Sequence, residues 1–291
     1  MIRIVTDSMS DVSQAQARAY DIDVLPQPIR FGEEEFWDDG VSITQEEFYR
    51  RIRVAPELPK TSQVPMGHFL DAFNAALADP AGQVLCITGS SLLSGCYQSA
   101  CLARESCADP DRVVVIDSLN ATCAETLLVE EAVRQRDAGR SLPEIVARME
   151  DMKSRYKIIG MADDLKYLVM GGRLSPLVGK VGTALNIKPT LKIEGGIVDK
   201  AGVVRGNAKG RAWYIEQLKL FPPDKDIPLY IGGADCPDMV ALIRSQLEAA
   251  GLDLPEIREV NIGCLIGTHV GPGLTLVCWA KNVDKGGPLS S

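Results

Sequence analysis

The chain has 291 residues, of which 46% are hydrophobic and 24% are charged, and its formal net charge is −8. These proportions are typical of a globular protein with a large apolar core, and they exclude a disordered chain, a collagen-like chain and a disulfide-stapled miniprotein. The acidic excess gives no overall attraction to nucleic acid, because Lys and Arg supply most of that affinity. At ~150 residues per domain, the length predicts about two domains.

Apolar runs alternate with amphipathic stretches through the first half of the chain. The runs cover residues 2–5, 84–88 and 113–116, and helices are predicted after Asp11, after Ser94 and over residues 120–138 and 142–152. This alternation predicts a mainly parallel sheet with helices on both faces. Polar residues follow each run and should share one rim of the sheet, where ligands of such folds gather.

A second α/β unit of a different kind is expected from residue 158 onward. Runs at 156–161, 187–193, 196–204, 229–231 and 274–279 read as strands, and the glycines at 195–196 predict a hairpin between the second and third of these runs. Helices are expected over residues 208–220 and after Pro237. The expected organisation is an N-terminal α/β domain over 1–157, a C-terminal mixed α/β domain over 158–283 and a flexible tail over 284–291.

Residues 260–280 lack Asp, Glu, Lys and Arg, but glycines and a proline interrupt the apolar run. A bilayer span needs ~20 apolar residues, so this stretch is predicted to be a buried loop followed by a strand. No transmembrane segment is expected. The early Asp7 argues against a signal peptide. Eight cysteines without a Cys-x-x-Cys pair, and only two histidines, argue against a zinc site and fit a cytoplasmic protein.

Three hydroxyl residues could serve a local or a ligand-binding role. Ser94 precedes a predicted helix, where its hydroxyl can cap the helix and also donate to an anion. Thr61 and Ser62 precede Pro65 and can either fix the entry to a helix or donate to a ligand oxygen. The sequence alone does not choose between these roles.

One histidine and a group of cations have similar alternatives. His269 lies among glycines in a predicted turn, which favours a ligand role over a core position. Arg173 follows two glycines and is expected to pair with a carboxylate. Residues 173–211 hold eight cations and two anions, and they form either a solvated face or a docking surface for an acidic or phosphate-bearing partner.

A nucleophilic hydrolase built on Ser94, His269 and an Asp is an alternative function. It lacks the expected nucleophile elbow, because Leu93 stands where the second glycine of G-x-S-x-G should be. A sensor of phosphate-bearing ligands that uses the cations of 173–211 is a further alternative.

Seven segments in order resemble the DegV family of bacterial lipid-binding proteins. They are Thr6-Asp7-Ser8-x-x-Asp11, Thr61-Ser62-Gln63-x-Pro65, the segment from Ser90 to Ala100, Asp117-Ser118, the segment from Tyr167 to Ser175, Ile187-Lys188-Pro189 and the segment from Ile266 to Gly273. The order of seven segments makes the resemblance specific although each segment is short. Cys96 departs from the pattern, because the family usually has Thr there.

The resemblance implies a two-domain α/β protein with a long-chain fatty acid between the domains and no other cofactor. Members of the family look like carrier subunits that present the acyl carboxylate to a separate ATP-dependent fatty acid kinase, which makes the acyl phosphate. The chain itself would then not be an enzyme, and its membrane contact would be limited to the surface. Residues implied at the carboxylate are Thr61, Ser62, Ser94, Gly95, Thr268 and His269. Arg173 and Arg205 match the basic region implied for the kinase or the head-group end.

Overall fold

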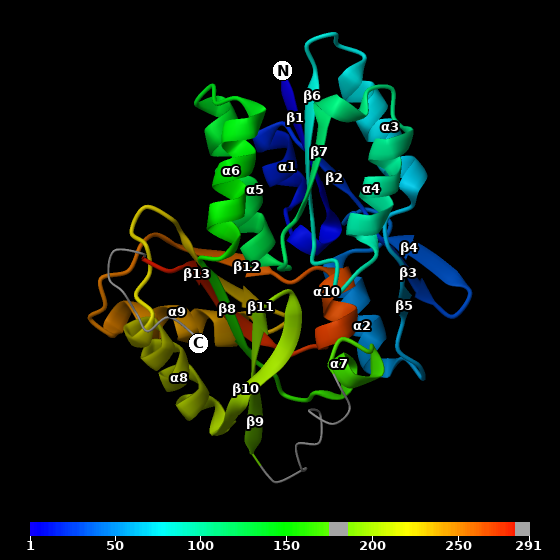
Figure 1. Ribbon diagram of the computed structural model, residues 1–291. Coiled ribbons are helices and arrows are strands. Elements are labelled where there is room, and N and C mark those ends of the chain that lie inside the picture. Colours follow the sequence, from blue (N-terminus) through cyan, green and yellow to red (C-terminus); the bar gives the residue numbers. More distant parts are fainter. Residues whose placement is uncertain (175–185, 283–291) are drawn as a thin grey trace. The chain divides into compact units, whose positions relative to one another are not determined.

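The computed structural model describes residues 1–174 and 186–282 and groups into two compact units. Unit 1 comprises residues 1–154, 195–197 and 263–268, and unit 2 comprises 155–194, 198–262 and the residues from His269 onward (Figure 1). Each unit consists of several separate stretches of the chain, whereas the sequence analysis placed a single domain boundary after residue 157. The predicted tail over 284–291 lies outside the described residues.

Unit 1 contains a four-stranded parallel sheet, as the alternation of apolar runs and helices predicted. Its order is β2 (Asp23–Leu25), β1 (Ile2–Asp7), β6 (Gln83–Thr88) and β7 (Val113–Asp117). Neighbouring residues of a strand point to opposite faces. Val5 therefore packs with Phe69 and Phe73, whereas the Thr6 hydroxyl donates to Glu125 at 3.1 Å on the other face.

Helices cover both faces of this sheet (Figure 1). On one face lie α3 (Met66–Leu77) and α4 (Cys96–Ser106), and on the other lie α5 (Cys123–Asp137) and its neighbour α6 (Leu142–Lys153). The short helix α1 (Gln14–Tyr20) contacts β2 and begins with a capping box between Ser13 and Gln16. Two 3-10 turns, η1 (Ser8–Ser10) and η2 (Pro110–Arg112), complete this α/β part.

A small antiparallel sheet adds to unit 1 and was not predicted from the sequence. Its order is β4 (Glu34–Trp37), β3 (Pro28–Phe31) and β5 (Lys60–Thr61). Helix α2 (Gln45–Val54) follows β4, and the Thr44 hydroxyl accepts from the Glu47 N–H at its start. Polar residues fill about half of these short strands, so the segments lack the apolar runs that marked the larger sheet.

Unit 2 contains a six-stranded mixed sheet, which confirms the mixed α/β class expected for the second half. The order is β10 (Ile197–Arg205), β9 (Ile187–Glu194), β8 (Tyr156–Met161), β13 (Thr275–Ala280), β11 (Leu229–Gly233) and β12 (Ile257–Asn261). Only β11 and β12 are described as a parallel pair. Helices α8 (Gly206–Leu220) and α9 (Pro237–Ala249) pack on one face around Tyr214 and Trp279.

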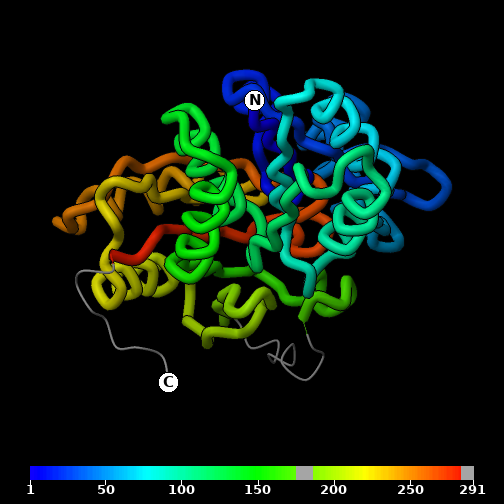
Figure 2. The backbone as a smooth tube through the Cα atoms, turned by 45° about the horizontal axis from the view of Figure 1, so that its top comes forward, coloured from blue at the N-terminus to red at the C-terminus, as the bar shows by residue number. Residues whose placement is uncertain are grey.

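Two short helices in the second half carry predicted site residues. Helix α7 (Lys166–Met170) precedes Gly171, and helix α10 (Cys264–Val270) contains Thr268 and His269. The prediction of a loop around His269 was therefore wrong. The glycines here allow close packing, since a Cβ on Gly267 would lie 2.6 Å from the Tyr49 hydroxyl oxygen. Figure 2 shows the orange residues of α10 among the blue and cyan elements of unit 1.

All eight cysteines are free thiols. No helix within residues 1–174 or 186–282 has the length and apolarity needed to cross a membrane.

Candidate functional site

The carboxyl ends of β1 and β6 are joined by one buried carboxylate. Asp7 Oδ1 accepts from the Met9 N–H at 2.8 Å, and Oδ2 accepts from the Gly89 N–H at 3.1 Å. Burial raises the pKa of Asp7 to about 6, although these two donors and the Cys96 thiol act in the opposite direction. The polar residues that follow the strands thus share a rim, as predicted.

The Ser94 hydroxyl and the backbone carbonyl of Ser62 meet at the side chain of Gln27. The Gln27 Nε2 lies 3.4 Å from the Ser94 Oγ and 3.5 Å from the Ser62 carbonyl oxygen. Ser62 and Ser94 belong to separate loops, one after β5 and one before α4, so Gln27 connects them. Gln27 is 2% exposed. It was missed from the sequence because an isolated Gln between two prolines carries no recognisable motif.

The surroundings of Ser94 define its role. The N-cap of α4 is Gly95 rather than Ser94, and the Ser94 Oγ accepts from the Cys96 N–H at 3.4 Å. A Cβ on Gly95 would lie 3.0 Å from the Gln63 side-chain amide, so this amide covers the helix start. The Ser94 hydroxyl donates to the Cys96 Sγ at 3.4 Å. The side chains bonded to Ser94 are thus an amide and a thiol, and neither is a general base.

Cys96 itself is fully buried. Its sulfur accepts from the Val64 N–H at 3.4 Å, and burial is the main cause of its strongly raised thiol pKa. The thiol therefore stays neutral and serves as an internal partner of Ser94.

Thr61 and Thr268 have different local settings within unit 1. Thr61 is on β5, where it is paired with Ile29 of β3. Thr268 is buried, and its hydroxyl donates to the Cys264 carbonyl oxygen at 3.0 Å within α10. The roles of Thr61 and Thr268 at a carboxylate stay predictions.

His269 lies with Arg173 in unit 2. Burial, with a smaller effect of the Arg173 charge, lowers the pKa of His269 to about 3, so the imidazole is neutral near pH 7. A Cβ on Gly171 would lie 2.6 Å from the His269 Nδ1, and Arg173 Nη1 donates to the Gly171 carbonyl oxygen at 2.6 Å. Arg205 ends β10 and is exposed.

Two carboxylates hold the start of α10. Asp11 Oδ1 accepts from the Gly263 N–H, and the Asp38 carboxylate accepts from the N–H groups of Cys264 and Leu265 at 3.1 and 3.2 Å. Burial raises the pKa of Asp11 to about 8 and that of Asp38 to about 6. The DegV-like segment at residues 6–11 included Asp11, but nothing in the sequence pointed to Asp38.

No cluster of three His, Cys, Asp or Glu side chains suited to a metal ion occurs in the part of the chain that the structure describes.

A sequence model of the DegV family, described as an uncharacterised protein family, matches residues 1–282. The chain belongs to the DegV family. A protein of Thermotoga maritima named as a fatty acid-binding protein is 34% identical over 282 residues, which cover 94% of this chain and 95% of that protein.

Solved structures of the family share the fold. A DegV family protein from Thermus thermophilus, described by its fatty acid binding, has a TM-score of 0.88 and 29% identity, with 96% of this chain and 99% of that chain covered. The fatty acid kinase B3 protein of Streptococcus pneumoniae, loaded with linoleic acid, has a TM-score of 0.83 and 22% identity over 97% of this chain and 100% of that one. At 22% identity, the second likeness concerns the fold.

Proposed function

We propose that this protein binds a long-chain fatty acid and takes up its carboxylate at the Ser94 hydroxyl beside Gln27. The observation that carries the proposal is that the Gln27 amide holds the Ser94 hydroxyl and the Ser62 backbone carbonyl together, which brings the loops of Ser62 and Ser94 to one place at the rim of the parallel sheet. The fatty acid-binding relative in Thermotoga maritima supports it over almost the whole chain.

The chemistry of a fatty acid suits such a site. A carboxylate only accepts hydrogen bonds, and hydroxyl and neutral imidazole N–H groups supply donors. Burial of a carboxylate without partners costs several kcal/mol, so donors have to converge on it. Each buried CH₂ group gains ~0.8 kcal/mol, and a tail of ~16 carbons gains ~10 kcal/mol before the cost of association. The tail supplies affinity, and the donors fix the orientation.

We infer that the protein acts as a carrier rather than as an enzyme. In this role it presents the carboxylate to a separate ATP-dependent kinase, which forms the acyl phosphate. The motif resemblance supports this step, together with the cationic residues that include Arg173 and Arg205. The resemblance also assigns a donor role to His269, whose imidazole is neutral near pH 7. The eight free thiols are compatible with a reducing compartment such as the cytoplasm.

Native mass spectrometry of the protein purified from bacteria tests the proposal. We expect an added mass equal to that of a long-chain fatty acid, and delipidated protein should take up oleate. Protein that carries no lipid and fails to bind oleate or palmitate would contradict it. Turnover of p-nitrophenyl esters that is lost in Ser94→Ala would instead favour the hydrolase alternative.

A further inference from the structure

The Ser94 hydroxyl forms hydrogen bonds with neighbouring groups of unit 1 both as an acceptor and as a donor. A serine hydroxyl has two acceptor positions and one hydrogen to donate. Its oxygen lies 3.4 Å from Gln27 Nε2 and 3.4 Å from the backbone nitrogen of Cys96, and both of these nitrogens are donors. Both acceptor positions of Ser94 are therefore occupied, and only its hydrogen remains for a ligand.

The hydrogen of Ser94 is held by a weak partner. It points to the Cys96 Sγ at 3.4 Å, and a thiol sulfur is a poor acceptor. The sulfur also accepts from the Val64 N–H, so it keeps a partner without Ser94. A carboxylate oxygen is a much stronger acceptor than sulfur, so it can take the Ser94 hydrogen without leaving a buried polar group unpaired.

The orientation of the Gln27 amide is set by a second contact. Its nitrogen faces the Ser62 carbonyl oxygen, which can only accept, so the amide must present N–H groups to both serines. The Gln27 Oε1 has no hydrogen-bond partner among residues 1–174 and 186–282 although it is buried. Buried acceptors usually have a hydrogen-bond partner. Here the amide is oriented so that its nitrogen donates to Ser62 and Ser94, and this orientation leaves its oxygen without one.

The backbone of Gln27 is fixed on both sides. Its N–H donates to the Ser8 Oγ at 3.1 Å, and its carbonyl oxygen accepts from the Asp38 N–H at 2.9 Å. The amide therefore reaches Ser94 from a rigid position.

We propose that Gln27 is a positioning residue that determines head-group specificity: by occupying the acceptor position of Ser94, it restricts Ser94 to donating. The site then favours a head group that only accepts, such as a carboxylate, and disfavours an alcohol, whose own hydrogen finds no acceptor on Ser94. This inference rests on the proposed fatty acid binding and adds the basis of its selectivity.

The test compares oleate with oleyl alcohol as competitors of a bound fluorescent fatty acid. In Gln27→Met, which keeps the length of the side chain but has no N–H, the Ser94 oxygen regains a free acceptor position for the alcohol. We expect the preference for oleate over oleyl alcohol to fall roughly 3–10-fold, as one neutral hydrogen bond would give. In Gln27→Glu the new carboxylate takes the Ser94 hydrogen, and the affinity for oleate should fall while that for the alcohol does not.

A double-mutant cycle separates this role from a structural one. In a Ser94→Ala background, Gln27→Met should change the preference by roughly less than twofold, since the two residues act through one contact. An unchanged preference in both Gln27 variants, or an equal change with and without Ser94, overturns the inference. Failure of the unaltered protein to bind oleate overturns the proposed function as well.

Discussion

The Asp11 Oδ1 and the backbone nitrogen of Gly263 lie 2.9 Å apart in a hydrogen bond that spans 252 positions of the sequence. A Cβ at position 263 would lie 2.7 Å from the same oxygen, so any larger residue here would displace the Asp11 carboxyl group. Asp38 binds the next two amides, and its charge adds to burial in raising the pKa of Asp11. The start of α10 therefore depends on two neighbouring carboxyl groups.

Asp11→Asn should flatten the dependence of stability on pH. The pKa of Asp11 rises from 3.8 to about 8 on folding, so the folded state holds more protons between these values. The free energy of unfolding should then fall as the pH rises from about 4 to about 8. Urea denaturation at several pH values measures the slope. The exposed Asp71→Asn serves as a control, and parallel curves for the unaltered protein and Asp11→Asn would contradict the assignment.

Ser94→Ala should weaken oleate binding. A hydrogen bond to a charged group contributes about 1.5–3 kcal/mol, which corresponds to roughly 10–100-fold in the dissociation constant. Titration of delipidated protein with oleate gives this value. Ser91→Ala alters an exposed serine of the same loop and should bind normally; an equal effect of the two substitutions would argue against a direct contact.

Gly171→Ala should destabilise the protein by about 1–3 kcal/mol through overpacking. The new Cβ would meet the His269 Nδ1 at 2.6 Å and the Tyr167 carbonyl oxygen at 2.9 Å. Thermal unfolding measures the loss. Gly67→Ala is the matched control, since its Cβ meets nothing within 4 Å on helix α3, and it should leave the stability equal or slightly raised. Equal melting temperatures for Gly171→Ala and the unaltered protein would disprove the clash.

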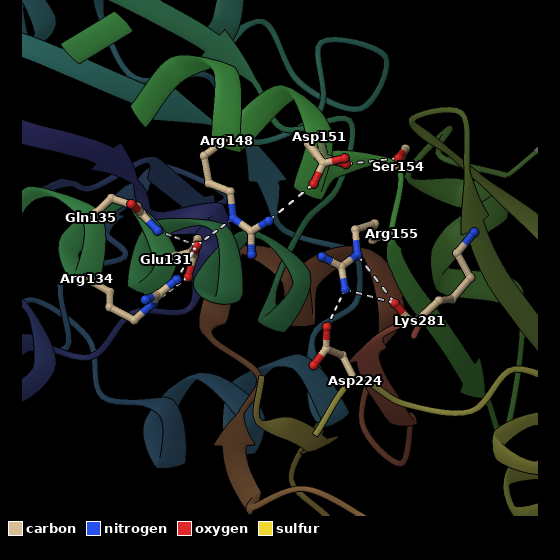
Figure 3. A network of polar contacts seen from close by, with 9 residues as sticks. All are labelled: Glu131, Arg134, Gln135, Arg148, Asp151, Ser154, Arg155, Asp224 and Lys281. Atoms are coloured by element: carbon tan, nitrogen blue, oxygen red, sulfur yellow. Dashed lines mark hydrogen bonds and ion pairs between the residues drawn. The ribbon is translucent and has the colours of Figure 1, made fainter. Parts of the chain in front are cut away.

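Glu131→Gln should break a polar network between α5 and α6 (Figure 3). The Glu131 Oε1 accepts from Arg148 Nε at 2.8 Å, from Arg134 Nη2 at 2.7 Å and from Gln135 Nε2 at 3.0 Å. Burial raises the pKa of Glu131, but these partners outweigh it and lower the pKa below its usual value. We expect a loss of about 1–3 kcal/mol near pH 7.

The pH dependence of this loss provides its check. A lowered pKa stabilises the fold above the pKa of the unfolded chain, and the contribution disappears as the pH falls through the folded value. The difference between Glu131→Gln and the unaltered protein should therefore shrink in acid. A difference that is constant from neutral to acidic pH would indicate a purely steric effect.

Most strands of the two larger sheets could be predicted because they contain apolar runs bounded by polar residues or glycines, whereas β2 (Asp23–Leu25) and β12 (Ile257–Asn261) are too short or too polar to form such runs and were not predicted. Strand β8 was expected over residues 156–161 and is Tyr156–Met161. In contrast, β4 alternates little and exposes two glutamates, so it carries no such pattern. Helix α10 was missed because glycine is unfavourable inside a helix, and its one glycine, Gly267, allows close contact with Tyr49 in a distant part of the sequence.

The candidate site was predictable only in part. Thr61, Ser62 and Ser94 stood out as hydroxyl groups beside turns, and the convergence of Ser62 and Ser94 required the fold to bring two loops together. Gln27 has no motif, and its importance depends on which atoms its amide reaches. Roles that depend on a bound ligand, such as those of Arg173 and Arg205, stay predictions.

The discontinuous composition of unit 1 limits how the gene can be cut. A fragment that ends at Ser154 would lack residues 263–268, and the carboxylates of Asp11 and Asp38 would lose their amide partners. It would also lack the hairpin tip at Gly196, whose carbonyl oxygen accepts from the Ser90 hydroxyl. Residues 1–154 are therefore not a self-contained domain that can be moved into another protein. A fusion protein or chimera should keep the chain from Met1 to Asn282 intact.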